Sequence, residues 1–283
     1  MFRAYAKINI GLYVIERRPD GFHNIETVFH RVAIADTLSL TPAGEIRVSS
    51  SSPDAPSDNS NICHKAAALL QAYLKTSQGV HIHIEKHVPV GAGLGGGSAD
   101  AACVLRQLPA LWGATVPEET LRTMALQLGS DVPYFLSPGS AVAAGRGELL
   151  QYFTLDVPYT ILLCNPGIHV ATGWAYGRIR PGTDGKPDDL ATIVRKGMSD
   201  PSLLGQYLRN DFEAVVFSAH PEVRQIKEDM VSAGAVFAMM SGSGSTVYGL
   251  FLGAEAAKQC AAPLAAAGYR TFITPAHFTG AGQ

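Results

Sequence analysis

A phosphate-binding loop is the first chemistry that the sequence suggests, in residues 89–102, which read PVGAGLGGGSADAA. Five glycines lie in this stretch, and each would destabilise a regular helix or strand by up to about 1 kcal/mol relative to alanine. An alternating strand precedes it over residues 80–88, and an apolar helix follows from about Ser98. The first N–H groups of a helix are unsatisfied and attract phosphate, and glycines let the backbone approach its oxygens. The stretch therefore predicts a polyphosphate cradle.

Two polar side chains lie at the expected helix start. The Ser98 hydroxyl can cap the helix, or it can face a phosphate or the Mg²⁺ that accompanies one. Asp100 in the first turn favours a helix but would repel phosphate if it pointed inward, so we expect it to face sideways. A glycine-rich turn that serves only close packing is the alternative to a cradle.

A dinucleotide site is a second alternative, because Gly91, Gly93 and Gly96 match the pattern G-x-G-x-x-G. However, that pattern usually follows the strand that opens its domain, whereas several earlier elements precede this one. No second strand ending in an acidic residue follows about 20 residues later, where the ribose would bind. The ATP pattern G-x-x-x-x-G-K-[ST] is absent as well, since no lysine occurs between Lys86 and Lys186.

Two charged residues that could take part in chemistry, Lys7 and Asp131, lie far from this loop in the sequence. Lys7 interrupts an apolar strand, and Asn9 lies two residues on, so both side chains point to the same side. Asp131 follows an expected helix end and precedes a proline. A lysine on a polar outer strand face is the usual explanation of a residue such as Lys7, and a turn-forming role explains Asp131 as well as a chemical one does. Glu148 could assist a metal, although no ligand cluster accompanies it.

The composition excludes several classes of protein. The 283 residues carry 22 basic and 24 acidic side chains, a net charge of −2, so no basic excess favours nucleic acid or a membrane surface. The four cysteines show no C-x-x-C pair, and Arg3 and Lys7 break the apolar start that a signal peptide needs. We expect a cytoplasmic protein with reduced thiols that binds neither nucleic acid nor membrane.

The elements mix strands and helices without regular alternation, which favours the α+β class. An early strand with Ile8 and Ile10 should turn at Asp20-Gly21 and return through Ile25. The other expected elements are a mobile loop (49–61), helices (61–75, from 98, from 117, 202–218, 221–233, 254–266), strands (80–88, 141–144, 149–153, 160–164, 268–274) and a polar loop (181–189). A boundary near Asp156 divides the chain into domains 1–155 and 156–283.

The glycine stretch resembles the nucleotide-binding motif of the GHMP kinases, the superfamily of galactokinase, homoserine kinase and mevalonate kinase. Two further stretches fit that family in order and position, AKINIGL at residues 6–12 and MSGSGST at residues 240–246. The resemblance implies an ATP-dependent kinase that acts on an alcohol group and uses Mg²⁺. It also implies an N-terminal domain like domain 2 of ribosomal protein S5 and a ferredoxin-like α+β C-terminal domain.

Two more motifs are similar to one branch of this superfamily. They are DGFH at residues 20–23 and LGSDVP at residues 128–133. The branch phosphorylates the 2-hydroxyl of a cytidine diphosphate-linked methylerythritol in the non-mevalonate route to isoprenoid precursors. A kinase of the mevalonate or homoserine type, or an NAD-binding oxidoreductase, is the alternative. The chain could be a monomer or a homodimer.

The resemblance also assigns roles to residues. It implies that Asp131 takes the proton of the acceptor hydroxyl, that Lys7 pairs with Asp131 near the transferring phosphate, and that Asn9 helps to hold the acceptor. Phe22, where the family commonly has tyrosine, should stack on the cytosine, and His23 should hydrogen-bond its edge. The remaining implied substrate contacts are Thr172, Tyr176 and Gly242. The implied ATP contacts are Asn61, Lys86, Pro89, Val90, Gly91, Ala92, Gly93, Leu94, Gly95, Gly96, Gly97, Ser98 and Ala99.

Overall fold

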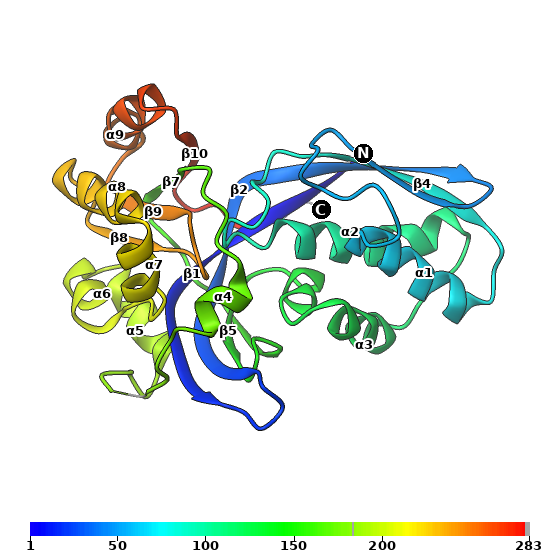
Figure 1. Cartoon of the computed structure of the whole chain (residues 1–283), viewed down its shortest axis with the longest axis horizontal. Helices are drawn as coiled ribbons and strands as arrows, with labels where there is room; N and C mark the ends of the chain where they lie inside the picture. Colours follow the sequence, from blue (N-terminus) through cyan, green and yellow to red (C-terminus); the bar gives the residue numbers. More distant parts are fainter. Residues whose placement is uncertain (183, 281–283) are drawn as a thin grey trace.

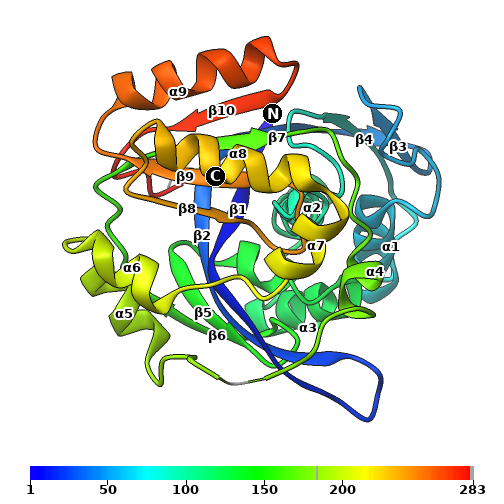
Figure 2. The same cartoon turned by 60° about the vertical axis from the view of Figure 1, so that its left-hand side comes forward.

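The computed structural model of the chain describes residues 1–182 and 184–280 and contains two β-sheets (Figures 1 and 2). Thr183, in the polar loop expected at 181–189, and residues 281–283 lie outside the described residues. The strands are β1 (Phe2–Arg17), β2 (His23–Ala43), β3 (Ile46–Ser50), β4 (Gly79–Glu85), β5 (Ser140–Ala144), β6 (Leu149–Phe153), β7 (Thr160–Asn165), β8 (Phe237–Met240), β9 (Val247–Phe251) and β10 (Arg270–Thr274). The helices are α1 (Ile62–Leu74), α2 (Gly96–Leu111), α3 (Glu118–Leu128), α4 (Thr172–Tyr176), α5 (Leu190–Gly197), α6 (Pro201–Tyr207), α7 (Glu213–Ala219), α8 (Pro221–Ser232) and α9 (Ala254–Ala266), with a short 3₁₀ turn η1 (Val132–Leu136).

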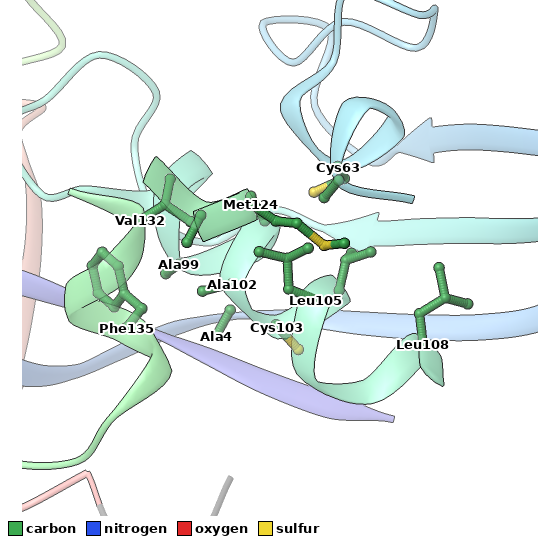
Figure 3. Close-up of a cluster of buried hydrophobic side chains, with 14 of the residues drawn as sticks. Ala4, Cys63, Ala99, Ala102, Cys103, Leu105, Leu108, Met124, Val132 and Phe135 are labelled. Carbon is green, nitrogen blue, oxygen red and sulfur yellow. The ribbon is translucent and has the colours of Figure 1, made fainter. Parts of the chain in front are cut away.

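The first sheet has the order β3-β4-β2-β5-β6, and β1 pairs with β2 beside this path. Only the β3–β4 pair is parallel among these pairings. Alternating apolar side chains of β4 are buried because α1 and α2 cover one face of the sheet. Figure 3 shows this core, in which Leu105 of α2 lies near Met124 of α3. The packing fixes the position of α2, whose first turn belongs to the glycine stretch.

The second sheet is antiparallel and has the order β10-β7-β9-β8. With α8 and α9 it forms the strand–helix–strand–strand–helix–strand pattern of a ferredoxin-like unit. Successive residues of β7 point to opposite faces, and both faces are buried. Leu162 packs in the cluster that contains α8 and α9, whereas Ile161 packs in a cluster with Ile8 and Val28 of the β1–β2 pair.

The long strands β1 and β2 therefore join the two parts of the molecule. Figures 1 and 2 show them running between the helices α1–α3 and the C-terminal helices α5–α9. Their pairing is irregular at three places, one of them between Tyr5 and Lys7 and one between Ile10 and Leu12. Such irregularities bend a strand and change the direction of its side chains. Both flank the residues at which the sequence predicted chemistry.

The α+β class is confirmed, and most of the expected elements are present. The helix expected over residues 202–218 is wrong, because the chain breaks there into α6 and α7. Between them the buried Asn210 amide donates to the carbonyl oxygens of Met240 and Gly242, which a continuous helix would prevent. The loop expected from residue 49 begins later, since β3 continues to Ser50. The division at residue 156 stays a prediction. No helix of the described residues has both the length and the apolar character needed to cross a bilayer.

Candidate active site

A buried lysine on β1 lies at the centre of the site. Lys7 is 3% exposed, and its Nζ donates to Asn9 Oδ1 at 2.7 Å, which confirms that the two side chains share one side of the strand. The irregular pairing near Lys7 leaves its backbone N–H to donate to Leu94 O of the glycine stretch at 3.0 Å. The ammonium also lies 4.8 Å from the centre of the Phe29 ring. Lys7 is therefore fixed by the strand, the loop and its neighbours.

Asp131 forms an ion pair with this lysine. It lies between α3, which ends at Leu128, and the turn η1. The distance from Lys7 Nζ to Asp131 Oδ2 is 3.4 Å, and the Asp131 side chain is 34% exposed while that of Lys7 is 4% exposed. The carboxylate is thus held by a buried cation but remains accessible to a ligand. This is the arrangement that a general base for a bound hydroxyl requires.

The glycine stretch forms the wall of a cavity of about 480 Å³ next to this pair. Helix α2 begins at Gly96, and its N-cap is Gly95 with a positive φ of 68°. The expectation that Ser98 caps the helix is therefore wrong, because it lies in the first turn, two residues after the start. The exposed Gly97 and the neighbouring Ser98 border the cavity, so the unsatisfied N–H groups of the helix start open into it.

Close packing and phosphate access are both reasons for the glycines. Gly93 has a φ of 78°, and a Cβ there would lie 2.1 Å from the carbonyl oxygen of Ser241. The Ser241 hydroxyl donates to Gly93 O at 2.9 Å, which joins the late loop 241–246 to the glycine stretch. By contrast, the nearest atom to a Cβ at Gly97 would be Ile62 Cγ2 at 3.8 Å. Packing therefore explains Gly93, while the open space at Gly97 faces the cavity.

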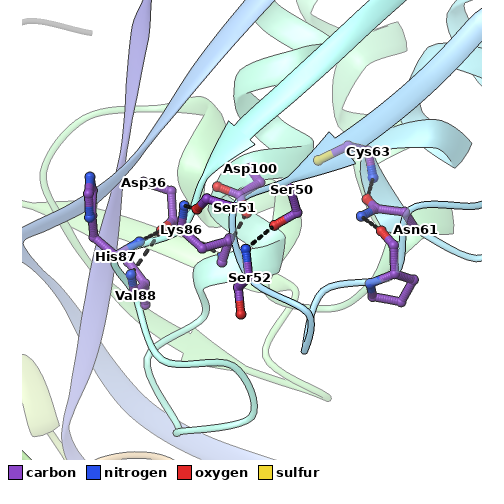
Figure 4. A network of polar contacts seen from close by, with 11 residues as sticks. Asp36, Ser50, Ser51, Ser52, Asn61, Cys63, Lys86, His87, Val88 and Asp100 are labelled. Carbon is purple, nitrogen blue, oxygen red and sulfur yellow. Dashed lines mark hydrogen bonds and ion pairs between the residues drawn. The ribbon is translucent and has the colours of Figure 1, made fainter.

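A second lysine, Lys86, borders the same cavity and belongs to the polar network of Figure 4. Lys86 Nζ contacts Asp36 Oδ2 at 2.5 Å and Asp100 Oδ2 at 3.0 Å, and the side chains of all three residues are at most 5% exposed. Lys86 is therefore buried, although it directly follows the end of β4. Asp100 turns into this buried cluster, where Lys86 offsets its charge, and it also borders the cavity.

The remaining contacts of the cluster hold the chain that enters the glycine stretch. Asp36 Oδ1 accepts the backbone N–H groups of His87 and Val88 at 2.6 and 2.8 Å. Burial raises the pKa of Asp100 to about 7 although Lys86 opposes the shift, and the Asp36 charge adds to the rise. Burial opposes the charge of Lys86, but Asp100 and Asp36 raise its pKa above the usual value. The lysine is thus charged, and it stabilises both carboxylates.

A second cavity of about 800 Å³ adjoins the first. Phe22, which is 54% exposed, and His23 border it, and the His23 ring stacks on that of Tyr176 with 4.9 Å between centroids. The Arg146 guanidinium lies 4.6 Å from the centre of the Phe22 ring. Burial and then the charge of Arg17 lower the pKa of His23, so its neutral ring offers one donor and one acceptor. The residues that border both cavities are Ser98, Asp131, Arg146, Thr172 and Tyr176.

Comparisons with known proteins identify the family to which this chain belongs. The model for the GHMP kinases N terminal domain matches residues 61–153, and that for the GHMP kinases C terminal matches residues 191–270. The chain is 44% identical over 279 residues to 4-diphosphocytidyl-2-C-methyl-D-erythritol kinase of Prosthecochloris aestuarii, with 98% of this chain and 97% of the relative covered. The chain belongs to the GHMP kinase family.

Other GHMP kinases agree with this assignment. The corresponding kinase of Chlorobium luteolum is 43% identical, with 98% of this chain and 96% of the relative covered. A crystal structure of 4-(cytidine 5'-diphospho)-2C-methyl-D-erythritol kinase superposes with a TM-score of 0.82 at 34% identity and covers 96% of this chain and 97% of the other. Homoserine kinase from Cytophaga hutchinsonii, at 19% identity and a TM-score of 0.72, covers 98% of this chain and 95% of the other and shares the fold. As a GHMP kinase, the chain is an ATP-dependent phosphotransferase.

The GHMP kinase fold brings most of the expected residues together. Asn61, Lys86 and most of the glycine stretch border the first cavity, whereas Leu94 and Ala99 do not and are buried. Asn61 also caps α1, since its Oδ1 accepts the N–H of Cys63. Asn9 and Gly242, which were expected to bind the alcohol substrate, border the first cavity and not the second.

Sequence reasoning misjudged or missed several residues in and around the two cavities. Glu148, considered as a metal ligand, instead accepts the N–H of Arg146 at 2.5 Å and borders neither cavity. Arg146 itself went unnoticed, although its place beside Gly147 in an expected turn was a signal. Asp36 and Thr27 lie inside an apolar strand and carried no signal of their own, because their partners are distant in sequence.

Proposed function

We propose that this chain phosphorylates the 2-hydroxyl of 4-diphosphocytidyl-2-C-methyl-D-erythritol with ATP, in the non-mevalonate synthesis of isoprenoid precursors. The observation that carries the proposal is the position of Asp131. This carboxylate is held by Lys7 and borders both the cavity of the glycine stretch and the cavity of Phe22 and His23. A phosphoryl donor in the first cavity and an alcohol in the second would therefore meet beside a base.

The reaction needs alignment and charge neutralisation rather than covalent help. The hydroxyl of the alcohol gives its proton to Asp131 while its oxygen forms a bond to the γ-phosphorus of ATP. The bond between that phosphorus and the bridging oxygen breaks, and ADP leaves with the electron pair. The N–H groups at the start of α2 oppose the negative charge of the phosphates, and Lys7 keeps the carboxylate in position.

The second cavity has the groups that a cytidine diphosphate needs. The exposed ring of Phe22 provides a face for a base, and such stacking contributes roughly 1–3 kcal/mol. Phenylalanine has no hydroxyl group to bond the base, so the base edge is left to the neutral His23. Arg146 lies over the same ring and brings a positive charge toward the diphosphate. The Tyr176 ring stacks on the His23 ring and borders the same cavity.

Magnesium fits this site only as a companion of the phosphates. Among residues 1–182 and 184–280, no group of three or more histidine, cysteine, aspartate or glutamate side chains could hold a metal ion. Mg²⁺ usually keeps several waters and binds through one or two protein groups plus the phosphates of a nucleotide. Ser98 borders both cavities, and its hydroxyl is the protein group that would contribute here. When bound, Mg²⁺ offsets phosphate charge.

A coupled assay of ADP release tests the proposal. The purified protein is given ATP and Mg²⁺ with the cytidyl substrate and, in parallel, with mevalonate, homoserine and galactose. We expect turnover with the cytidyl compound alone, and turnover of another alcohol in its place would contradict the proposal. An NAD-binding protein would instead change the fluorescence of NADH and show no thermal shift with ATP. The cytoplasmic location and a monomeric or dimeric state stay predictions from the sequence.

A further inference from the structure

A buried threonine with no contact to either cavity is connected to the catalytic lysine by hydrogen bonds. Thr27 lies on β2, is fully buried, and borders neither cavity. The Asn9 Nδ2 group donates to its hydroxyl oxygen at 3.0 Å, and the hydroxyl in turn donates to Gly11 O. The other end of the Asn9 amide accepts from Lys7 Nζ at 2.7 Å. Four residues therefore form one chain of hydrogen bonds that ends at the ion pair with Asp131.

The directions of these bonds are all determined. A lysine ammonium can only donate, so the Asn9 oxygen must face Lys7 and its NH₂ group must face Thr27. The Thr27 hydroxyl has one hydrogen, and it is needed by Gly11 O. If the Asn9 amide turned over, two donor groups would face each other at Lys7 and the Gly11 carbonyl would lose its partner. A buried carbonyl or amine without a partner costs more than a hydrogen bond contributes.

The backbone creates the need for this hydroxyl. The pairing of β1 with β2 shifts between Ile10 and Leu12, and Gly11 between them has a φ of 73°, as in a glycine-containing β-bulge. A residue in a bulge is left out of the regular ladder, so its carbonyl needs another partner. Thr27 pairs with Leu12 in the register and supplies that partner. Threonine is also stiff about its first side-chain torsion, which holds the hydroxyl in one place.

We propose that Thr27 is a positioning residue for phosphoryl transfer, because its hydroxyl fixes the orientation of the Asn9 amide and thereby the Lys7 ammonium that holds Asp131. This inference rests on the proposed function, since it concerns the same reaction. Thr27 acts through Asn9 and touches neither the nucleotide nor the alcohol.

The central experiment compares Thr27→Val with Thr27→Ser in the ADP-release assay. Valine keeps the shape of threonine without the hydroxyl, so we expect kcat to fall about tenfold or more while KM for ATP and for the cytidyl substrate stays within about twofold. Serine keeps the hydroxyl on a freer side chain and should stay within about threefold of the wild-type kcat. Equal losses in both variants, or an unchanged kcat in Thr27→Val, would overturn the proposal.

A matched control separates positioning from stability. Thr274 is a buried threonine whose hydroxyl accepts the N–H of Ala33, outside both cavities. We expect Thr274→Val to lower the melting temperature and to keep the wild-type kcat. If it lowered kcat as much as Thr27→Val does, the loss of kcat would report stability and the proposal would be wrong. If Thr27→Val does not fold, Thr27→Cys, which retains a weak donor, is measured instead and should show an intermediate kcat.

A double variant tests the route through Asn9. If Thr27 acts only by orienting Asn9, then Thr27→Val should cause no further fall in kcat when Asn9 is already replaced by alanine. Losses that multiply in the double variant would show a separate action of Thr27 and would contradict the proposed route.

The wild-type protein in the same assay shows whether a negative result contradicts the proposed function or only the role of Thr27. No wild-type turnover contradicts the proposed function, whereas normal wild-type turnover with an unaffected Thr27→Val contradicts only the role of Thr27.

Discussion

Two lysine–aspartate clusters lie at the same cavity and differ in what surrounds them. Lys7 and Asp131 are 3.4 Å apart, and one third of the Asp131 side chain is exposed at the junction of two cavities. Lys86 contacts Asp36 at 2.5 Å and Asp100 at 3.0 Å, and all three side chains are almost completely buried. Lys7 and Asp131 form the open cluster, in which a carboxylate is available to a substrate. Lys86, Asp36 and Asp100 form the closed cluster, whose side chains are buried against one another.

The difference teaches how to separate a catalytic ion pair from a structural one. A general base must reach the proton that it accepts, so its carboxylate cannot be fully enclosed. A buried ion pair, by contrast, constrains the chain around it, and the Asp36 carboxylate holds the backbone of His87 and Val88 just before the glycine stretch. We therefore expect the two clusters to serve the proposed reaction in different ways. Lys7 and Asp131 would take part in the chemistry, and the Lys86 cluster would position the glycine stretch.

The largest expected effect is on turnover at the open cluster. Asp131→Asn keeps the shape of the side chain but cannot accept the hydroxyl proton, so we expect kcat to fall by about 10²–10⁴-fold. The Kd for ATP, measured by calorimetry, should change little, because Asp131 does not lie on the glycine stretch. An unchanged kcat would exclude Asp131 as the base. The urea midpoint should also stay near that of the wild type, since the residue is partly exposed.

The next effect is on stability at the closed cluster. Lys86→Met leaves Asp36 and Asp100 buried together without a cation, and such a change costs about 3–5 kcal/mol in the free energy of unfolding. Lys7→Met is the matched variant, and we expect a smaller loss of stability because Asp131 can turn toward solvent. Urea unfolding of both variants tests this order. Equal losses at the two lysines would remove the distinction between the clusters.

Arg146 is a third cation at these cavities: it belongs to neither cluster and borders both cavities. We expect Arg146→Ala to raise KM for the cytidyl substrate about tenfold, as the loss of one charge-assisted contact predicts, with kcat nearly unchanged. Arg195→Ala is the control, since that guanidinium lies in the same way over Phe153 and borders neither cavity. If both variants gave the same KM, Arg146 would have no role in binding.

The sequence predicted the open cluster better than the closed one. Spacing placed Lys7 and Asn9 on one side of a strand, and a helix end followed by proline placed Asp131 in a turn, so local rules were sufficient. The pairing of Lys7 with Asp131 came only from the resemblance to the GHMP kinases. Asp36 carried no signal, because its partners Lys86 and Asp100 are 50 residues or more away in the chain and meet only when β2, β4 and α2 pack.

The periodicity of apolar residues predicted most helices and strands, but it did not predict the places where these elements are interrupted. The helices around residues 118–128 and 254–266 and most strands follow from alternating or helical apolar patterns. The break at Asn210 and the bulge at Gly11 do not, because each exists to satisfy carbonyl groups that tertiary packing leaves without a partner. Ser98 was misplaced by two residues for a related reason: the helix begins at a glycine that only the tight loop geometry requires.

The last expected effect is the pH dependence of the stability that Asp100 gives to the closed cluster. Burial, together with the charge of Asp36, raises the pKa of Asp100 to about 7, whereas an aspartate in the unfolded chain titrates near pH 4. The folded protein therefore holds this proton more tightly, and the stability that it gives is complete below about pH 4 and is lost as the pH rises to about 7. Asp100→Asn resembles the protonated form and should not show that loss. In urea unfolding, we expect the free energy of unfolding of the variant relative to that of the wild type to increase by about 1–3 kcal/mol between pH 5 and pH 8. A difference that is constant over this range would mean that Lys86 keeps Asp100 ionised throughout.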